Sequence, residues 1–138
     1  MQKITLFFLL FTFFSLSFSS CSKYEEGSKF TLLTKKQRMV NNWKMKKLTA
    51  NGDDITSLNI ITEIDIRDNG TITVRGAFFG VPTSDDGYWV FDNDKSHLVI
   101  TNQNGGVNSY EIIRLKDKEL KVKITTNEIE YLHEYEEK

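Results

Sequence analysis

Apolar and polar residues alternate along most of the chain after Trp43, and this period of two predicts β-strands. The clearest example is Leu120, Val122 and Ile124, which are separated by two lysines. Turn-forming residues divide the alternating runs at short intervals, so the strands follow one another closely. The pattern predicts eight strands, over residues 43–47, 60–67, 71–75, 88–91, 97–101, 107–115, 120–124 and 129–135.

A helical segment precedes these strands. Thr34 is a suitable N-cap, residues 35–38 favour helix, and Met39 and Val40 can pack inward. The sequence therefore predicts a short helix over residues 34–42, with the pair of asparagines at its end as the stop.

The connections between the strands contain clear turn signals. Asn69-Gly70 stands between two alternating runs, which is the strongest short-range signal for a β-hairpin. A type I′ turn is expected there, because Asn and Gly tolerate the positive φ that it requires at both central residues. Residues 77–86 contain Gly80 and Pro82 and are expected to form a looser connection.

Short connections make neighbouring strands pair antiparallel, as a meander. Charged residues at alternate positions give the sheet one wet face and one buried face. A sheet of eight such strands tends to close, because closure removes its exposed edges. The predicted fold class is all-β: an antiparallel up-and-down barrel of about eight strands, preceded by a short N-terminal helix. A strongly curled sandwich is the alternative.

The first 20 residues have the composition of a secretory signal peptide. Lys3 supplies the positive charge, residues 4–18 the apolar core, and Ser19 and Ser20 the small residues at the cut. A membrane-spanning helix needs about 20 apolar residues, and this apolar core is shorter. We therefore expect the segment to be removed. Phe18-Ser19-Ser20-Cys21 resembles the lipobox of bacterial lipoproteins, which implies lipidation of Cys21 and a membrane anchor. An ordinary secretory signal followed by a free thiol is the alternative.

These features divide the chain into a signal peptide (1–20), a lipid anchor and tether (21–33) and a barrel domain (34–138). Without Lys3 the chain carries 17 basic and 19 acidic residues, with no basic stripe, which argues against nucleic-acid binding. Cys21 is the only cysteine, so no internal disulfide can form.

The sequence offers few residues for catalysis or metal binding. The two histidines, His97 and His133, have no zinc-like spacing, and His133 is expected at the surface or the barrel rim. Residues 92–96 imitate the start of a calcium loop but lack its glycine, so a turn is expected. The acidic pairs at 53–54 and 85–86 fall in expected loops. We therefore predict a non-enzymatic protein without a metal or cofactor.

Several structural motifs resemble the lipocalin-like lipoprotein domains of Bacteroidetes, over roughly residues 34–135. They are the helix leading into Trp43-Lys44-Met45, the hairpin at 68–71, the aromatic strand 88–91, and Tyr110-Glu111-Ile112 with the hairpin that follows it. The resemblance implies a barrel held at the outer membrane by an acylated, for example palmitoylated, Cys21, facing either the periplasm or the cell surface.

Two functions fit such a barrel. In the first, the barrel binds a small apolar ligand, and the candidate binding residues are Phe78, Phe79, Trp89 and Tyr110. These aromatics can equally fill the core. In the second, the domain contacts an envelope protein or a glycan through its loops, above all through residues 77–86.

Overall fold

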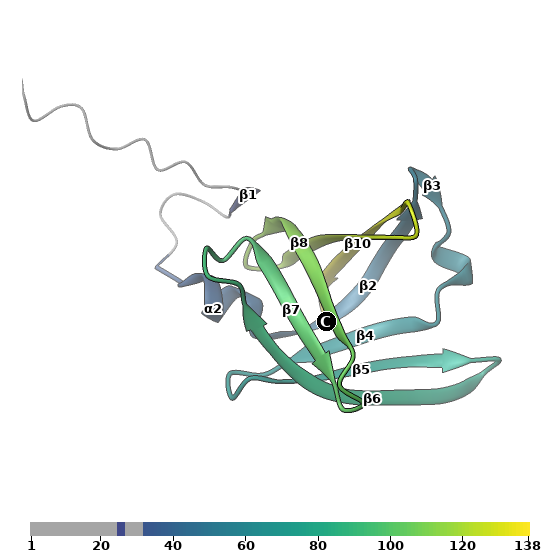
Figure 1. Cartoon of the computed structure of the whole chain (residues 1–138), viewed down its shortest axis with the longest axis horizontal. Coiled ribbons are helices and arrows are strands. Elements are labelled where there is room, and N and C mark those ends of the chain that lie inside the picture. The colour runs from purple at the N-terminus through teal and green to yellow at the C-terminus, as the bar shows by residue number, and fades with distance from the viewer. Residues whose placement is uncertain (1–24, 27–31) are drawn as a thin grey trace, which may run out of the picture.

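The structure, a computed structural model, describes residues 25–26 and 32–138 of the chain. Strands wrap into a barrel, a short helix lies against one end, and a long hairpin extends past the other end (Figure 1). In chain order the elements are β1 (Glu25–Glu26), α2 (Lys35–Met39), β2 (Asn41–Ala50), β3 (Asp53–Asp54), the 3-10 helix η1 (Thr56–Leu58), β4 (Ile61–Ile66), β5 (Thr71–Phe78), β6 (Val81–Phe91), β7 (His97–Asn102), β8 (Val107–Leu115), β9 (Glu119–Thr126) and β10 (Ile129–Glu137).

Eight of the described strands form a closed antiparallel barrel. From β4 to β10 each strand pairs with its neighbour in the chain, and β4 pairs with β2. The barrel closes where β10 pairs with β2, from Tyr131 opposite Ala50 to Glu137 opposite Trp43. The predicted all-β, up-and-down barrel of eight strands is confirmed.

Helix α2 begins with a complete capping box. The Thr34 side chain accepts a hydrogen bond from the Gln37 amide, and the Gln37 side chain accepts one from the Thr34 amide. The helix ends at Met39, earlier than predicted, because Asn41 and Asn42 already belong to β2 and pair with β4. Their pairing with a neighbouring strand outweighs the weak local preference for helix.

The hairpin predicted at Asn69-Gly70 is present, but its turn differs from the expected type I′. Arg67 and Thr71 close a three-residue loop, in which only Gly70 has a positive φ, of 85°. A turn of this length combines a type I bend with a residue in the left-handed region, which Gly70 supplies. The two-residue turn with positive φ at both positions occurs instead at Phe79-Gly80, with φ of 49° and 80°.

The expected loose connection over residues 77–86 is wrong. β5 continues to Phe78 and β6 begins at Val81, so most of this segment is a paired β-ribbon. β4 pairs with β5 only as far as Gly76, and β7 pairs with β6 only from Gly87 onward. We call the two-stranded extension, residues 77–86, the arm.

Two glycines mark where the arm leaves the barrel. A Cβ on Gly76 would lie 2.1 Å from the carbonyl oxygen of Ile60, and one on Gly87 would lie 2.6 Å from that of Thr101. Both contacts are with backbone atoms, which cannot turn aside. The strands approach each other this closely only because glycine stands at both corners.

The short strand β1 pairs in parallel with β8, Glu25 with Arg114 and Glu26 with Leu115. Two residues of the segment expected to be a tether therefore lie beside the barrel. The expected signal peptide, Cys21 and the rest of residues 22–31 lie outside the described part of the chain. Within that part, no helix has both the length and the apolar character needed to cross a membrane.

Candidate functional site

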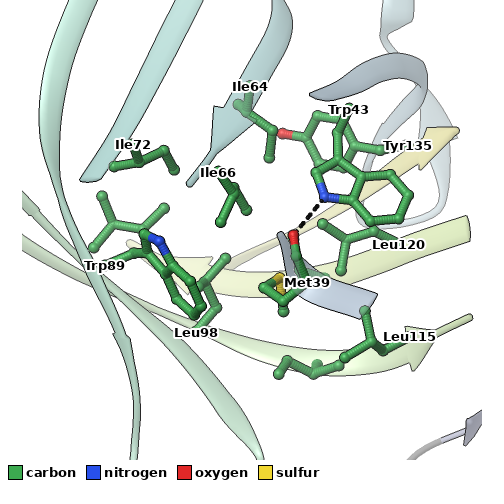
Figure 2. Packing of buried hydrophobic residues seen from close by; sticks show 13 residues of the cluster. Met39, Trp43, Ile64, Ile66, Ile72, Trp89, Leu98, Leu115, Leu120 and Tyr135 are labelled. Atoms are coloured by element: carbon green, nitrogen blue, oxygen red, sulfur yellow. Dashed lines mark hydrogen bonds between the residues drawn. The ribbon is translucent and has the colours of Figure 1, made fainter. Parts of the chain in front are cut away.

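The barrel interior is filled at the end that α2 covers. Met39 from α2 and Trp43 from β2 are fully buried, and the Trp43 indole N–H donates a 3.0 Å hydrogen bond to the Met39 carbonyl (Figure 2). Around them pack side chains that are at most 1% exposed: Ile66, Ile72, Leu98, Leu115 and Leu120. This end of the barrel is therefore a closed hydrophobic core.

Burial decreases toward the other end of the barrel. Alternation along each strand places Val74, Tyr110 and His133 on the same inward faces as the core residues, yet they are only partly buried. Further out, Phe78 on the inward face of β5 is 52% exposed. The inward-facing side chains are thus fully buried at the end that α2 covers and partly exposed at the other end, which we call the open end. We call the partly exposed inward side chains there the cup, and the closed core below them its floor.

Two tyrosines and a histidine from β8 and β10 lie together on the inward face, where the closed core meets the cup. The rings of Tyr110 and His133 meet edge to face at 5.8 Å, and the Tyr135 hydroxyl lies 3.4 Å from His133 Nδ1. Desolvation by burial lowers the pKa of His133 to about 4 and raises the pKa of Tyr110. Burial, with a smaller contribution from Tyr110, also raises the pKa of Tyr135. All three groups are therefore neutral at physiological pH.

The four aromatic residues proposed as ligand contacts do not form one site. Trp89 is 4% exposed and lies in the core, where its indole N–H donates a 2.8 Å hydrogen bond to the Arg67 carbonyl. Tyr110 faces the cup beside His133. Phe78 and Phe79 lie at the tip of the arm, with their rings 4.5 Å apart. Of the four, Tyr110 is at the cup wall and Phe78 at its mouth, while Trp89 belongs to the floor.

Sequence reasoning placed His133 at the surface or rim, and the structure places it on the inner wall. The signal was present in the alternation of Ile129, Tyr131, His133 and Tyr135, which share one face of β10. Tyr135 on that face is buried, so the face is the inward one. A histidine that continues an aromatic face is as much an interior candidate as its neighbours.

The tip of the arm combines exposure with unfavourable backbone geometry. Phe79 is 92% exposed and has a φ of 49°, in the left-handed region that bulky residues avoid. Val81, which follows the turn, is 64% exposed. Backbone strain of this kind is found preferentially at sites of recognition. The tip is therefore a second candidate contact surface.

The turn at Asp92 folds as expected for a turn. The Asp92 carboxylate accepts hydrogen bonds from the amides of Ser96 and His97, and His97 Nδ1 lies 2.9 Å from its second oxygen. Partial burial alone would raise the pKa of Asp92, but these hydrogen bonds lower it below its ordinary value. Asp92, Asp94 and His97 lie close enough together to hold a cation, but bonds within the turn already occupy the Asp92 oxygens.

The two acidic pairs also have structural partners. Asp54 in β3 accepts hydrogen bonds from the Thr56 hydroxyl at 2.6 Å and the Thr56 amide at 3.0 Å, which lower its pKa. Asp86 in the arm accepts a 2.6 Å hydrogen bond from the Thr73 hydroxyl. Each of these two carboxylates therefore has a hydrogen-bond partner within the described part of the chain.

No protein-family model matches the chain, and no curated protein sequence is significantly similar to it.

Proposed function

We propose that this chain is a lipid-anchored, non-enzymatic protein of the bacterial cell envelope, whose lipocalin-like barrel binds a small apolar ligand at its open end. The observation that carries the proposal is the fall in burial along the barrel axis, from the fully buried Met39 and Trp43 to the partly exposed Val74 and Tyr110. An eight-stranded barrel is just wide enough to hold one small ligand.

The chemistry of the cup supports an uncharged, mainly apolar ligand. Val74, Ile61 and Met45 are partly buried and pack against the core, so they present apolar surface above the floor. Tyr110 and His133 add two polar groups that are neutral at physiological pH. A mostly apolar wall with a few polar groups is typical of small-molecule sites.

Filling the cup tests this proposal. In a chain beginning at Ser22, which retains every described element, Val74→Trp puts a large ring into the cup. Val90→Trp is the matched control, because Val90 faces outward and is 59% exposed. We expect saturable binding of the neutral dye 1-aminoanthracene to the parent and to Val90→Trp, and its loss in Val74→Trp with the thermal transition retained. Equal dye binding by all three chains would contradict an interior site.

The anchor is supported by the sequence at the end of the signal peptide, where Cys21 follows two serines. Metabolic labelling with palmitate in a bacterial host tests it. We expect label in the parent protein and none in Cys21→Ser. An unlabelled parent whose mature form begins at another residue would rule out the anchor.

A second function, contact with a partner protein, is favoured by Phe79. Its side chain is almost fully exposed on a strained backbone, a combination that packing among the described residues does not explain. A photo-crosslinking residue at position 79 should capture an envelope protein in intact cells, and the same residue at position 104, in the β7–β8 turn, serves as the control. Identical capture from both positions, or none from either, would remove the support for this function.

A further inference from the structure

A polar hollow lies on the outside of the barrel, where the arm separates from β7. Its volume is about 290 Å³, and its side-chain lining comes mainly from Arg67, Thr71, Thr73, Asp86, Tyr88 and Gln103. We call it the outer groove. The volume is close to about 300 Å³, the lower end of the range for small-molecule sites.

The sheet geometry explains why these side chains share the outer face. Thr73 pairs with Asp86 and Thr71 pairs with Tyr88, so the four stand in two adjacent rows across β5 and β6. Their inward-facing neighbours on the same strands, Ile72 and Gly87, are buried. Because β6 pairs with β7 only from Gly87 onward, the space beside Asp86 is not covered by another strand and opens toward Gln103.

Hydrogen bonds hold the polar wall of the outer groove in place. Arg67 donates to Asp65 at 2.8 Å, to the Thr73 hydroxyl at 2.7 Å and to the Thr71 hydroxyl at 3.2 Å. Thr73, which is 5% exposed, donates in turn to Asp86 at 2.6 Å. The wall is thus ordered before any ligand arrives, which reduces the entropic cost of binding.

The other wall is aromatic and exposed. Tyr88 is 63% exposed, although it lies beside an ordered polar network. Its ring offers an apolar face next to hydrogen-bonding groups, and Gln103 adds an amide that both donates and accepts.

The charges around the groove exclude some ligand classes. The single cation of the wall, Arg67, is offset by Asp65 in direct contact and by Asp86 through Thr73. An anionic ligand would meet the Asp86 carboxylate in the lining, and a purely apolar ligand would desolvate polar groups without replacing their hydrogen bonds. The favoured ligand is neutral and has both an apolar face and hydroxyl groups along its edge.

We propose that the outer groove binds a neutral saccharide unit, whose ring stacks on Tyr88 while its hydroxyls bond to Asp86 and Gln103. A pyranose ring has this combination of an apolar C–H face and a polar edge. The site is separate from the cup and does not depend on a ligand there.

The test is an NMR titration of the ¹⁵N-labelled full-length protein, in micelles of a detergent without a sugar headgroup. The probes are the hexasaccharides of β-linked glucose, α-linked glucose and β-linked mannose. We expect saturable shifts of the amides of Asp86, Tyr88 and Gln103 with at least one probe. Absence of saturable shifts with all three, or shifts confined to Val74, Tyr110 and His133 in the cup, would overturn the proposal.

Variants separate stacking from hydrogen bonding. Tyr88→Ala should weaken binding about tenfold, the equivalent of one aromatic contact, whereas Tyr88→Phe should bind like the parent. Gln103→Ala, in an exposed turn that leaves the core untouched, should also weaken binding. Val90→Ala is the matched control on the same face of β6 and should have no effect. Equal weakening by Tyr88→Ala and Val90→Ala would refute stacking on Tyr88.

Discussion

His133 should make the stability of this protein depend on pH between neutrality and mild acid. Its imidazole is partly buried among Tyr110 and Tyr135, and burial lowers its pKa from 6.5 to about 4. The neutral form is therefore favoured in the folded state, while the unfolded chain has the ordinary value. As the pH falls below 6.5 the unfolded chain takes up a proton first, so the folded state loses stability.

The loss of folding free energy follows from the difference between the pKa of His133 in the folded and the unfolded chain. One pKa unit corresponds to 1.36 kcal/mol, so a change from 6.5 to about 4 amounts to about 3 kcal/mol. The contribution is fully present above pH 6.5, decreases as the pH falls toward 4, and is constant at lower pH. A loss of this size is a substantial fraction of the about 5–15 kcal/mol by which small domains are stable.

The assay compares the parent with His133→Phe, which retains a ring at this position but cannot take up a proton. Urea unfolding, followed through the fluorescence of the buried Trp43 and Trp89, gives the free energy of unfolding at each pH. Carboxylates titrate in both proteins, so the difference between them isolates His133. Between about pH 7 and about pH 4 the parent should lose about 3 kcal/mol more than the variant. A difference that stays constant across this range would show that His133 is not desolvated, and the reasoning about the cup wall would fail.

Three further substitutions test how the barrel is built. Trp43→Ala should cost about 3–5 kcal/mol, because it empties a fully buried site and removes the bond to Met39; a loss below about 1 kcal/mol in urea unfolding would mean that the floor is not packed as described. Gly76→Ala should cost about 1–3 kcal/mol, since its Cβ would collide with the Ile60 carbonyl, whereas Gly106→Ala, whose Cβ would come no nearer than 3.7 Å to the Asn102 side chain, should cost less; a reversed order would contradict the close approach at the corner. Thr34→Ala should cost about 1 kcal/mol by removing the helix cap, and Thr34→Ser should restore most of it in thermal unfolding; an unaffected Thr34→Ala would mean that α2 does not contribute to the closed end.

The barrel was predictable because its determinants are local. Alternation gives each strand an inward face, and short turns such as the one at Gly70 leave antiparallel pairing as the simplest arrangement. Closure follows from the number of strands and the cost of exposed edges. None of these inferences depends on which side chains contact one another in the interior.

The arm was not predicted from the sequence, and the reason is physical. Residues 81–86 are all exposed, because the ribbon has solvent on both faces, so its sequence carries no alternation between apolar and polar residues. The segment then has the composition of a loop, because it contains or adjoins Gly76, Gly80, Pro82 and Gly87. In the structure, two of these glycines lie at the corners of the arm and one lies in its tight turn. A strand that leaves the sheet loses the buried face that makes strands recognisable in a sequence.

The candidate site was predictable only in part, for a related reason. That Trp89 and Tyr110 face inward follows from alternation. Their positions along the barrel axis, relative to the end that α2 covers, do not follow from it. The position along the axis decides whether an aromatic ring packs in the closed core, as Trp89 does, or lies in the cup, as Tyr110 does. It depends on the stagger of eight strands, which is a property of the closed barrel rather than of any one segment.

The pairing of β10 with β2 sets the order in which the protein can fold. It brings Glu137 beside Trp43, the first strand of the barrel beside the last, and it uses nearly the whole length of the domain. Joining segments about 90 residues apart costs about 3 kcal/mol more in chain entropy than closing a tight hairpin. Until the nine residues of β10 have been synthesised, β2 and β9 each lack one of their partners, and the sheet stays open between these two strands. The barrel can therefore close only once β10 is available, so a nascent chain that ends before Ile129 has an open sheet with two unpaired edges.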